Sequence, residues 1–165
     1  MADLKAAKTD AEHQLWEQID GVHAGMLGVE GAGAMQPMAP ELDREAKTIW
    51  FFTRKSTDLA RQAARPGARG LFALVGKHHD YHASLSGRLE ERLDPAMRDR
   101  FWNSVIEAWF EGGKDDPDLT MLALKLDEGH IWASTDSTLK FGWQIAKANM
   151  THAEPDVGVT RQLTF

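Results

Sequence analysis

Short apolar segments separated by glycine, proline and aspartate recur along most of this chain. Several of them are rich in β-branched and aromatic residues or alternate apolar with polar positions, which is typical of strands. The run Leu71–Val75 is continuously apolar and is predicted to be a strand buried on both faces. Pro37 favours an edge strand or a bulge in its segment. The pattern predicts strands at residues 23–29, 34–42, 47–53, 71–75, 81–91, 121–126 and 130–133.

Apolar residues spaced three or four apart predict the helices. Thr9 and Glu12 have the spacing of a capping box, which predicts that a helix begins there and ends near Asp20. Ser56 or Thr57 can cap a second, short helix that ends near residue 65. A third helix is predicted at 95–110 and a fourth at 137–150, and the third carries an inward stripe of Met97, Phe101, Val105 and Trp109.

Turn residues separate strands that are close in sequence, so hairpin-like connections are expected between them. This pattern differs from the strand–helix alternation of a parallel α/β sheet. We therefore expect a mainly β (α+β) protein, a small antiparallel barrel with flanking helices. The chain has 165 residues, which suggests a single domain over 1–165. Its core is expected at about 12–150, followed by a polar, mobile tail at 151–165.

Charge and composition narrow the range of partners. The net charge of −6 argues against a broad nucleic-acid footprint. The absence of cysteine excludes disulfides, thiolate metal sites and cysteine nucleophiles. The polar N-terminus resembles no secretory signal, and no apolar run has the roughly 20 residues that span a bilayer. We expect a cytoplasmic protein with no nucleic-acid and no membrane partner.

Three familiar functional motifs do not fit this sequence. The glycines at 28, 31 and 33 precede a strand-like segment, whereas a dinucleotide fingerprint must open a helix. His78, His79 and His82 lie in a turn that enters a strand, where their spacing loses its value for metal binding, so no metal site is predicted. No serine, histidine and acid are arranged like a catalytic triad, and no nucleophile elbow is present.

The segment Trp50–Thr57 ends a buried strand with a hydroxyl, two cations and two more hydroxyls, just before a helix begins. Helix N-termini offer free N–H groups and a positive dipole end, both of which suit a phosphate. The alternative is a solvated loop with an ordinary N-cap. The sequence pattern leaves both interpretations open.

The segment Trp109–Leu119 places two aromatics, a glycine pair, a lysine and several acids around a proline where a helix must stop. An aromatic surface, a backbone that a ligand can approach and one cation are features of a small-molecule site. The alternative is that Gly112 and Gly113 end the helix, Asp116 and Pro117 begin another turn, and the aromatics belong to the core.

Taken together, these residues resemble the general-stress-protein branch of the pyridoxamine 5'-phosphate oxidase-like split-barrel proteins over roughly residues 12–150. The resemblance implies a six-stranded antiparallel split barrel, a homodimer, and two equivalent FMN sites in the dimer interface. The quoted motifs are Gly25-Met26-Leu27, Gln36-Pro37-Met38, Trp50-Phe51-Phe52-Thr53, Ser86-Gly87 and, most specific, the segment from Trp109 to Leu119.

The resemblance also implies where the flavin lies. The strand ending in Phe51-Phe52-Thr53 lines it, the loop around Ser56 holds its phosphate, and an aromatic of the Trp109 motif approaches its ring from the partner subunit. The implied cofactor-binding residues are Gln36, Pro37, Met38, Phe51, Phe52, Thr53, Lys55, Ser56, Trp109, Phe110, Gly113 and Lys114. No catalytic side chain is nominated.

Two positions depart from the family pattern. Met35 stands where an arginine is usual, and Asp58 stands where a lysine is usual. Each lost charge-assisted contact to a phosphate costs on the order of 1.5–3 kcal/mol, so FMN binding is expected to be weakened. FMN, FAD and no flavin all remain open.

Two functional hypotheses follow. The first is a flavin-binding protein that works as a flavin-dependent oxidoreductase in stress response. The second is a non-enzymatic split-barrel stress protein that has lost tight FMN binding and acts by ligand sequestration or partner binding. The C-terminal end lacks the arginine- and histidine-bearing segment used by pyridoxamine phosphate oxidases, so that activity is not expected.

Overall fold

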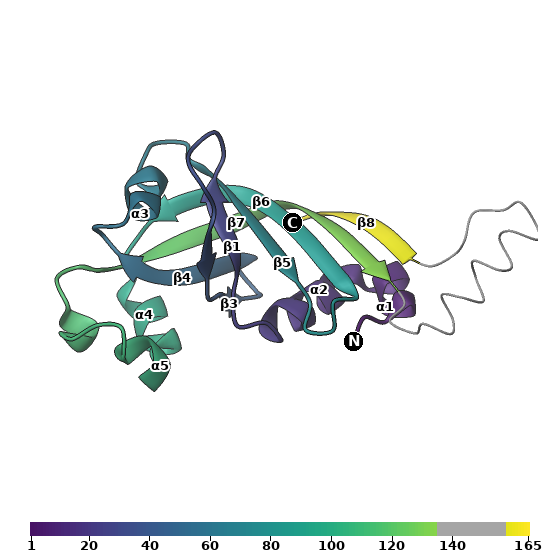
Figure 1. Ribbon diagram of the computed structural model, residues 1–165, viewed down its shortest axis with the longest axis horizontal. Coiled ribbons are helices and arrows are strands. Elements are labelled where there is room, and N and C mark those ends of the chain that lie inside the picture. The colour runs from purple at the N-terminus through teal and green to yellow at the C-terminus, as the bar shows by residue number, and fades with distance from the viewer. Residues whose placement is uncertain (135–157) are drawn as a thin grey trace, which may run out of the picture.

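An eight-stranded antiparallel sheet forms the body of the protein, which we describe from a computed structural model over residues 1–134 and 158–165 (Figure 1). The strands follow one another in space as β2-β1-β5-β6-β7-β4-β3, and β8 pairs with β7. Their bounds are β1 Gly25–Val29, β2 Gln36–Met38, β3 Glu41–Asp43, β4 Thr48–Arg54, β5 Arg69–Val75, β6 Tyr81–Glu91, β7 Leu119–Ser134 and β8 Gly158–Thr164. The expected antiparallel split barrel with flanking helices is confirmed.

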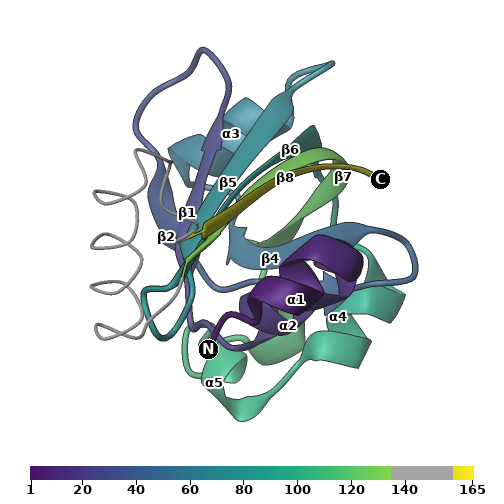
Figure 2. The ribbon, with the colours of Figure 1, turned by 90° about the vertical axis from the view of Figure 1, so that its right-hand side faces the viewer.

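The two ends of this sheet path are consecutive in the chain. Only Ala39 and Pro40 separate β2 from β3, yet β2 pairs with β1 and β3 pairs with β4. The prediction of one strand at 34–42 is therefore wrong, because the segment forms parts of two short strands. Pro40 has no N–H to donate and interrupts the ladder between them. The sheet curls, as Figure 2 shows, until its ends meet at this link. A split remains between β2 and β3, which do not pair with each other.

Alternate residues of the strands point into a continuous core that includes Leu27, Phe51, Phe72 and Leu85. The rings of Phe51 and Phe72 lie 5.2 Å apart across it. The strand at 71–75 was expected to be buried on both faces, which is wrong: β5 alternates, and Val75 is exposed. On its outer face, Leu71 and Ala73 are partly buried and Val75 is exposed.

The long strand β7 corrects a second prediction. Asp127-Glu128-Gly129 was expected to form a turn, but β7 runs through it without a break for 16 residues. The pairing with β6 shifts between Ser86 and Gly87, so that one extra β7 residue is accommodated there. The turn-like residues thus mark a bulge at which the strand bends.

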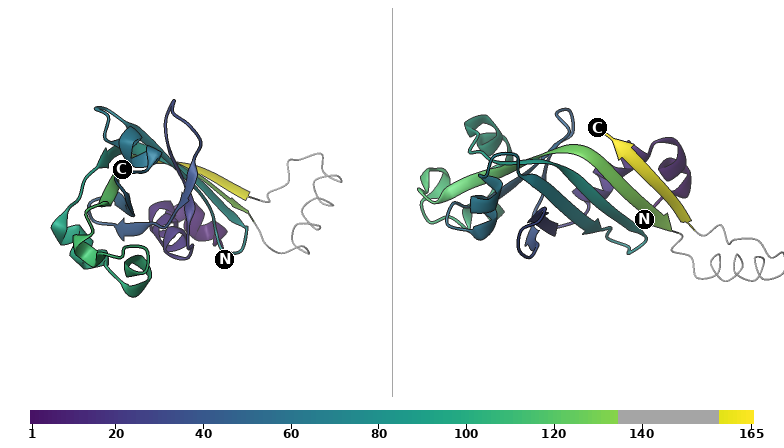
Figure 3. Two further views of the ribbon diagram at one scale, coloured as in Figure 1. Left: turned by 60° about the vertical axis from the view of Figure 1, so that its left-hand side comes forward. Right: turned by 90° about the horizontal axis from the view of Figure 1, so that it is seen from above.

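The N-terminal helices are α1 Leu4–Thr9 and α2 Ala11–Asp20. The expected capping box is wrong: Thr9 ends α1, and its hydroxyl donates a hydrogen bond to the Lys5 carbonyl at 3.1 Å. The helix α2 buries Leu15, Trp16 and Ile19 against the barrel. The Trp16 ring meets the Phe165 ring edge-on, with centroids 6.2 Å apart. The N-terminal helices lie beside β8 (Figure 3).

The predicted helix at 95–110 is interrupted. It consists of α4 Pro95–Phe101 and α5 Ser104–Glu107, because Asn103 turns the chain and caps α5 by accepting bonds from Val105 N–H and Ile106 N–H. The stripe is therefore not continuous. Met97 and Phe101 pack against Trp50 of β4, whereas Val105 and Trp109 are each 71% exposed. The short helices cover the outer face of β4 and β7.

Two further predictions concern the C-terminal end. The expected helix at 137–150 lies outside the described residues. The tail at 151–165 was expected to be mobile and to lie outside the core, which is wrong for residues 158–164, since β8 pairs with β7 along Glu128–Ser134 and Val159 is buried.

Helix α3, Asp58–Ala63, is capped by Thr57, whose hydroxyl accepts a hydrogen bond from Ala60 N–H at 3.2 Å.

Replacing Gly87 tests the bulge. A Cβ at this position would lie 1.9 Å from the Lys125 carbonyl oxygen, so Gly87→Ala must push β6 and β7 apart. We expect a loss of at least about 1–3 kcal/mol in the free energy of unfolding, measured in urea. Gly33→Ala is the control, because its Cβ would meet only the Gln62 side chain at 3.8 Å. Equal stability of the two variants would contradict this account of the bulge.

Candidate functional site

A cavity of about 380 Å³ lies at the split of the barrel. Its walls come from β2, β3 and β4, from the helix cap at Thr57, and from α5 with the turn after it. It is lined by Pro37, Met38, Ala39, Glu41, Phe52, Thr53, Arg54, Thr57, Val105, Ile106, Trp109 and Phe110. Segments far apart in sequence therefore meet here because the sheet closes on itself.

Aromatic side chains dominate one wall of this cavity. Phe110 is buried next to Ile106 and Leu119, while the Trp109 side chain is 71% exposed at the rim. The interpretation of Trp109 as a core residue is therefore wrong. Trp102 stands behind this wall, with its ring centroid 6.0 Å from Phe52 and 6.2 Å from Phe110. The packed rings support Phe52 and Phe110 in fixed positions.

Arg54 and Glu41 bring charge to the cavity. The Arg54 guanidinium lies over the Phe110 ring at 5.2 Å and donates a hydrogen bond to the Trp109 carbonyl, so it fixes the backbone of the aromatic wall. Burial, with a smaller contribution from the Asp20 carboxylate, raises the pKa of the Glu41 carboxyl above its ordinary value. Glu41 can therefore keep its proton to a higher pH than a solvated glutamate.

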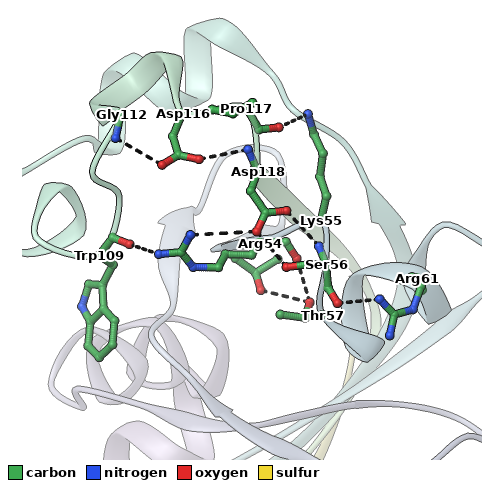
Figure 4. A network of polar contacts seen from close by, with 11 residues as sticks. Arg54, Lys55, Ser56, Thr57, Arg61, Trp109, Gly112, Asp116, Pro117 and Asp118 are labelled. Atoms are coloured by element: carbon green, nitrogen blue, oxygen red, sulfur yellow. Dashed lines mark hydrogen bonds and ion pairs between the residues drawn. The ribbon is translucent and has the colours of Figure 1, made fainter.

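The loop from Arg54 to Thr57 is tied to the acidic turn after α5 (Figure 4). Ser56 donates two hydrogen bonds to the Asp118 carboxylate, from its N–H to Oδ1 at 3.0 Å and from its hydroxyl to Oδ2 at 2.7 Å. Lys55 donates from Nζ to the Pro117 carbonyl at 2.9 Å and from its backbone N–H to the Asp118 carbonyl at 2.8 Å. We call these contacts the Ser56–Asp118 clasp.

The two positions that depart from the family pattern also have partners within the chain. Asp58 forms an ion pair with Arg61, whose guanidinium also donates to the Ser56 carbonyl at 2.5 Å. Met35 lies against Gly28, where an added Cβ would come within 2.8 Å of the methionine side chain. Asp58 is thus part of a local surface ion pair, and Met35 supplies apolar packing.

The acidic turn is held by its own backbone. The Asp116 carboxylate accepts hydrogen bonds from Asp118 N–H at 2.9 Å and from Gly112 N–H at 3.2 Å, and these bonds lower the pKa of Asp116. Gly113 has φ +62°, a conformation that favours glycine, and it opens a 3-10 turn, Gly113–Asp115. Lys114 donates to Asp99 Oδ1 at 2.9 Å.

The structure places six of the twelve predicted cofactor-binding residues in the lining of the cavity and the other six outside it. Phe51 is fully buried in the barrel core, and the Gln36 amide lies 3.5 Å from the Met38 sulfur. Lys55 and Ser56 belong to the clasp, whereas Gly113 and Lys114 belong to the acidic turn. The predicted residues that line the cavity are Pro37, Met38, Phe52, Thr53, Trp109 and Phe110.

Several cavity residues were not among those predicted from the sequence. Ala39 and Glu41 closely follow the Gln36-Pro37-Met38 motif, and proximity to it was their only signal. Arg54 and Thr57 belong to the segment Trp50–Thr57, which the sequence indicated as a possible anion site, although neither was named as a cofactor-binding residue. Val105 and Ile106 were assigned to a continuous core helix. Their position in the cavity depends on the break at Asn103, which the apolar spacing did not reveal.

Comparison with known proteins places this geometry in a family. Residues 10–156 match the sequence model described as "Pyridoxamine 5'-phosphate oxidase like". The chain belongs to this family. General stress protein 26 of Bacillus subtilis (strain 168) is 22% identical over 131 residues, which cover 78% of this chain and 93% of that protein. The family resemblance drawn from the sequence motifs is therefore confirmed.

Two solved structures are similar to this member of the family. A candidate general stress protein 26 from Jannaschia sp. CCS1 is 36% identical, with a TM-score of 0.79, and the match covers 94% of this chain and 99% of that chain. The general stress FMN/FAD binding protein of Xanthomonas citri is 39% identical, with a TM-score of 0.71, and the match covers 76% of this chain and 90% of that one.

A second cavity of about 480 Å³ lies on the outer face of the sheet of this family member. It is lined mainly by apolar atoms, and Met26, Val75 and Trp132 on this face are each between 41% and 45% exposed. The Trp132 ring stacks on His130 with centroids 6.2 Å apart. We call these four side chains the outer patch.

Residues 1–134 and 158–165 contain neither a candidate metal cluster nor a candidate membrane-spanning helix. In this part of the chain, no three His, Asp or Glu side chains are close enough to hold a metal ion together. His78, His79 and His82 are all exposed. No helix in the described ranges combines the length and the apolar character needed to cross a membrane.

The raised pKa of Glu41 leads to a pH-dependent stability. Because the folded protein keeps this proton to a higher pH than the unfolded chain, stability is lost as pH rises from the ordinary glutamate value, about 4.3, through the raised pKa. Glu41→Gln should therefore be more stable than the native chain at pH 7, by less than about 1 kcal/mol because the side chain is partly solvated.

This difference in stability should shrink below pH 4, where Glu41 of the native chain becomes protonated in the folded and in the unfolded state alike. Thermal unfolding midpoints at several pH values measure it. Glu45→Gln, which removes an exposed carboxylate on the next turn, controls for the change in net charge. A Glu41→Gln variant that is less stable than the native chain at pH 7 would contradict the assignment.

Proposed function

We propose that this protein binds a flavin, with the isoalloxazine ring against the aromatic wall of the cavity at the split. The observation that carries the proposal is this wall: Phe52, Phe110 and Trp109 of one chain face the cavity together with Pro37 and Met38. The proposal therefore departs from the resemblance, which implied an aromatic of this motif from the partner subunit. A largely apolar cleft of a few hundred Å³ with a small number of polar groups is what a planar cofactor ring needs. The name of the Xanthomonas citri relative, an FMN/FAD binding protein, supports the same ligand class.

The polar groups of the cavity lie at its edges. The hydroxyls of Thr53 and Thr57 are 3.4 Å apart, and Arg54 holds the carbonyl of Trp109. A bound flavin would supply the redox chemistry of an oxidoreductase. The chain itself would position the ring between apolar walls, limit access of water to it, and present Glu41 as a carboxyl with a raised pKa.

The homodimer is also a proposal, and the outer patch supports it. Solitary exposed apolar side chains are ordinary, but Met26, Val75 and Trp132 border one apolar cavity. A second copy of the chain would cover them. The family resemblance implies flavin sites in the dimer interface, and Pro37 borders both this cavity and the cavity at the split, so association and ligand binding are expected to depend on each other.

Ligand sequestration without turnover is the second candidate function. It is favoured by the contacts of the loop that was expected to hold the phosphate, since Ser56 is bound to Asp118 and Asp58 to Arg61.

The absorption spectrum of the purified protein and titration with FMN, FAD and riboflavin test flavin binding. Flavin-dependent oxidation of an electron donor then separates an oxidoreductase from a sequestering protein. Absence of any flavin binding would overturn the main proposal.

Trp109 allows a direct test of the ring position. Because its side chain is 71% exposed, Trp109→Ala should change the free energy of unfolding by no more than about 0.5 kcal/mol. Flavin affinity should fall about tenfold when the stacked ring is lost. Quenching of flavin fluorescence measures it, with Trp109→Phe as the control that retains an aromatic face. Unchanged affinity of the alanine variant would remove Trp109 from the site.

Trp132 provides the test of the homodimer. Trp132→Asp places a charge in the outer patch, and sedimentation should then report a monomer where the native chain is a dimer. Leu93→Asp is the matched control, because Leu93 is 39% exposed and lies outside the patch. A native chain that sediments as a monomer would contradict the proposed dimer, and a dimeric Trp132→Asp variant would contradict the outer patch as its interface.

A further inference from the structure

The Ser56–Asp118 clasp occupies the donors that a phosphate would need. The resemblance assigned the phosphate to the loop around Ser56, and the two donors of that residue both bind one carboxylate, at 3.0 and 2.7 Å. A carboxylate with two oxygens accepting from an N–H and a hydroxyl uses the same hydrogen bonds that a phosphate would use. Figure 4 shows Asp118 directed at Ser56 in this way.

The cations of the loop are engaged as well. Lys55 donates to the Pro117 carbonyl, Arg54 binds the Trp109 carbonyl and lies 3.9 Å from Asp118, and Arg61 pairs with Asp58. A phosphate placed here would have to break these contacts. It would also approach the carboxylate of Asp118, and like charges at close range disfavour binding.

The clasp lies at the protein surface, and its backbone hydrogen bond continues the sheet. It extends the β4–β7 ladder, which ends at the pair Arg54 and Leu119, because Lys55 N–H donates to the Asp118 carbonyl at 2.8 Å. Asp118 N–H is in turn held by Asp116. The backbone on both sides of the carboxylate is therefore fixed, and a ligand can displace the carboxylate only by a rotamer change of Asp118 that breaks both hydrogen bonds to Ser56.

We propose that Asp118 holds the place of a phosphate against Ser56, so that this protein selects its ligand by the aromatic ring and gains no affinity from a terminal phosphate. This inference rests on the proposed flavin function and narrows it. The preferred ligand class is a planar ring without a phosphate at this loop, for which riboflavin is the simplest flavin probe.

The first test compares riboflavin with FMN on the native chain. The two share the ring and ribityl chain and differ in the phosphate. Their dissociation constants should agree within about threefold, whereas a phosphate held by two or more charge-assisted bonds would favour FMN by about 100-fold or more. FMN that binds at least about tenfold more tightly than riboflavin would overturn the proposal.

The second test changes Asp118. Asp118→Asn keeps the shape of the side chain and one accepting oxygen but removes the charge. FMN affinity should rise about tenfold, and riboflavin affinity should not change. Asp115→Asn makes the same change of charge in the same turn, at an exposed residue outside the clasp, and should leave both affinities unchanged. A folded Asp118→Asn variant with an unaltered ratio of the two affinities would reject Asp118 as the determinant.

The third test needs no flavin. Inorganic phosphate, added across the millimolar range to the apo protein, should leave the Ser56 amide resonance of the native chain in place. A saturable shift of that resonance would overturn the proposal. If neither riboflavin nor FMN binds, the proposed function fails, and this titration still decides whether Asp118 blocks the loop. The two failures are therefore distinguishable.

Discussion

The short link between β2 and β3 is the constraint on which the rest of this structure depends. With only Ala39 and Pro40 between them, the two end strands of the sheet path must lie close together, although neither pairs with the other. An antiparallel sheet can satisfy this only by curling through its whole width. Proline is well suited to the link because it has no N–H to contribute to a ladder that must stop there.

The candidate site follows from the same constraint. The split leaves a gap in the backbone ladder, and the outer covering by α4 and α5 brings Trp109 and Phe110 to its edge. Apolar walls therefore arise from residues of the barrel and of the helical turn together. The polar groups of the site interact within the chain: the acids after α5 bind the loop after β4. Glu41, which lines the cavity, is partly desolvated.

Much of the fold could be predicted because strand formation depends on local patterns. The alternation in Tyr81–Glu91 and the apolar runs of β4 and β5 identified their strands, and the motif from Trp109 to Leu119 indicated a ligand site through its composition. The break at Asn103 and the continuation of β7 through Gly129 were not predictable in this way. The Asn103 cap is a local contact with the N–H groups of Val105 and Ile106, but the apolar spacing on both sides of it fits one continuous helix. The continuation of β7 depends on its pairing with β6, a segment distant in the sequence.

The sequence by itself determined the family, the antiparallel class of the sheet, and the aromatic and polar motifs that line the split, because these depend on residue type and short spacing. Only the tertiary structure decided which of those motifs contact one another. Ser56 and Asp118 are separated by 62 positions, and their hydrogen bonds exist because β4 and β7 end side by side. The cations and hydroxyls of the loop after β4 therefore suggested a site for a bound anion, whereas in the folded chain the Asp118 carboxylate accepts the hydrogen bonds of Ser56.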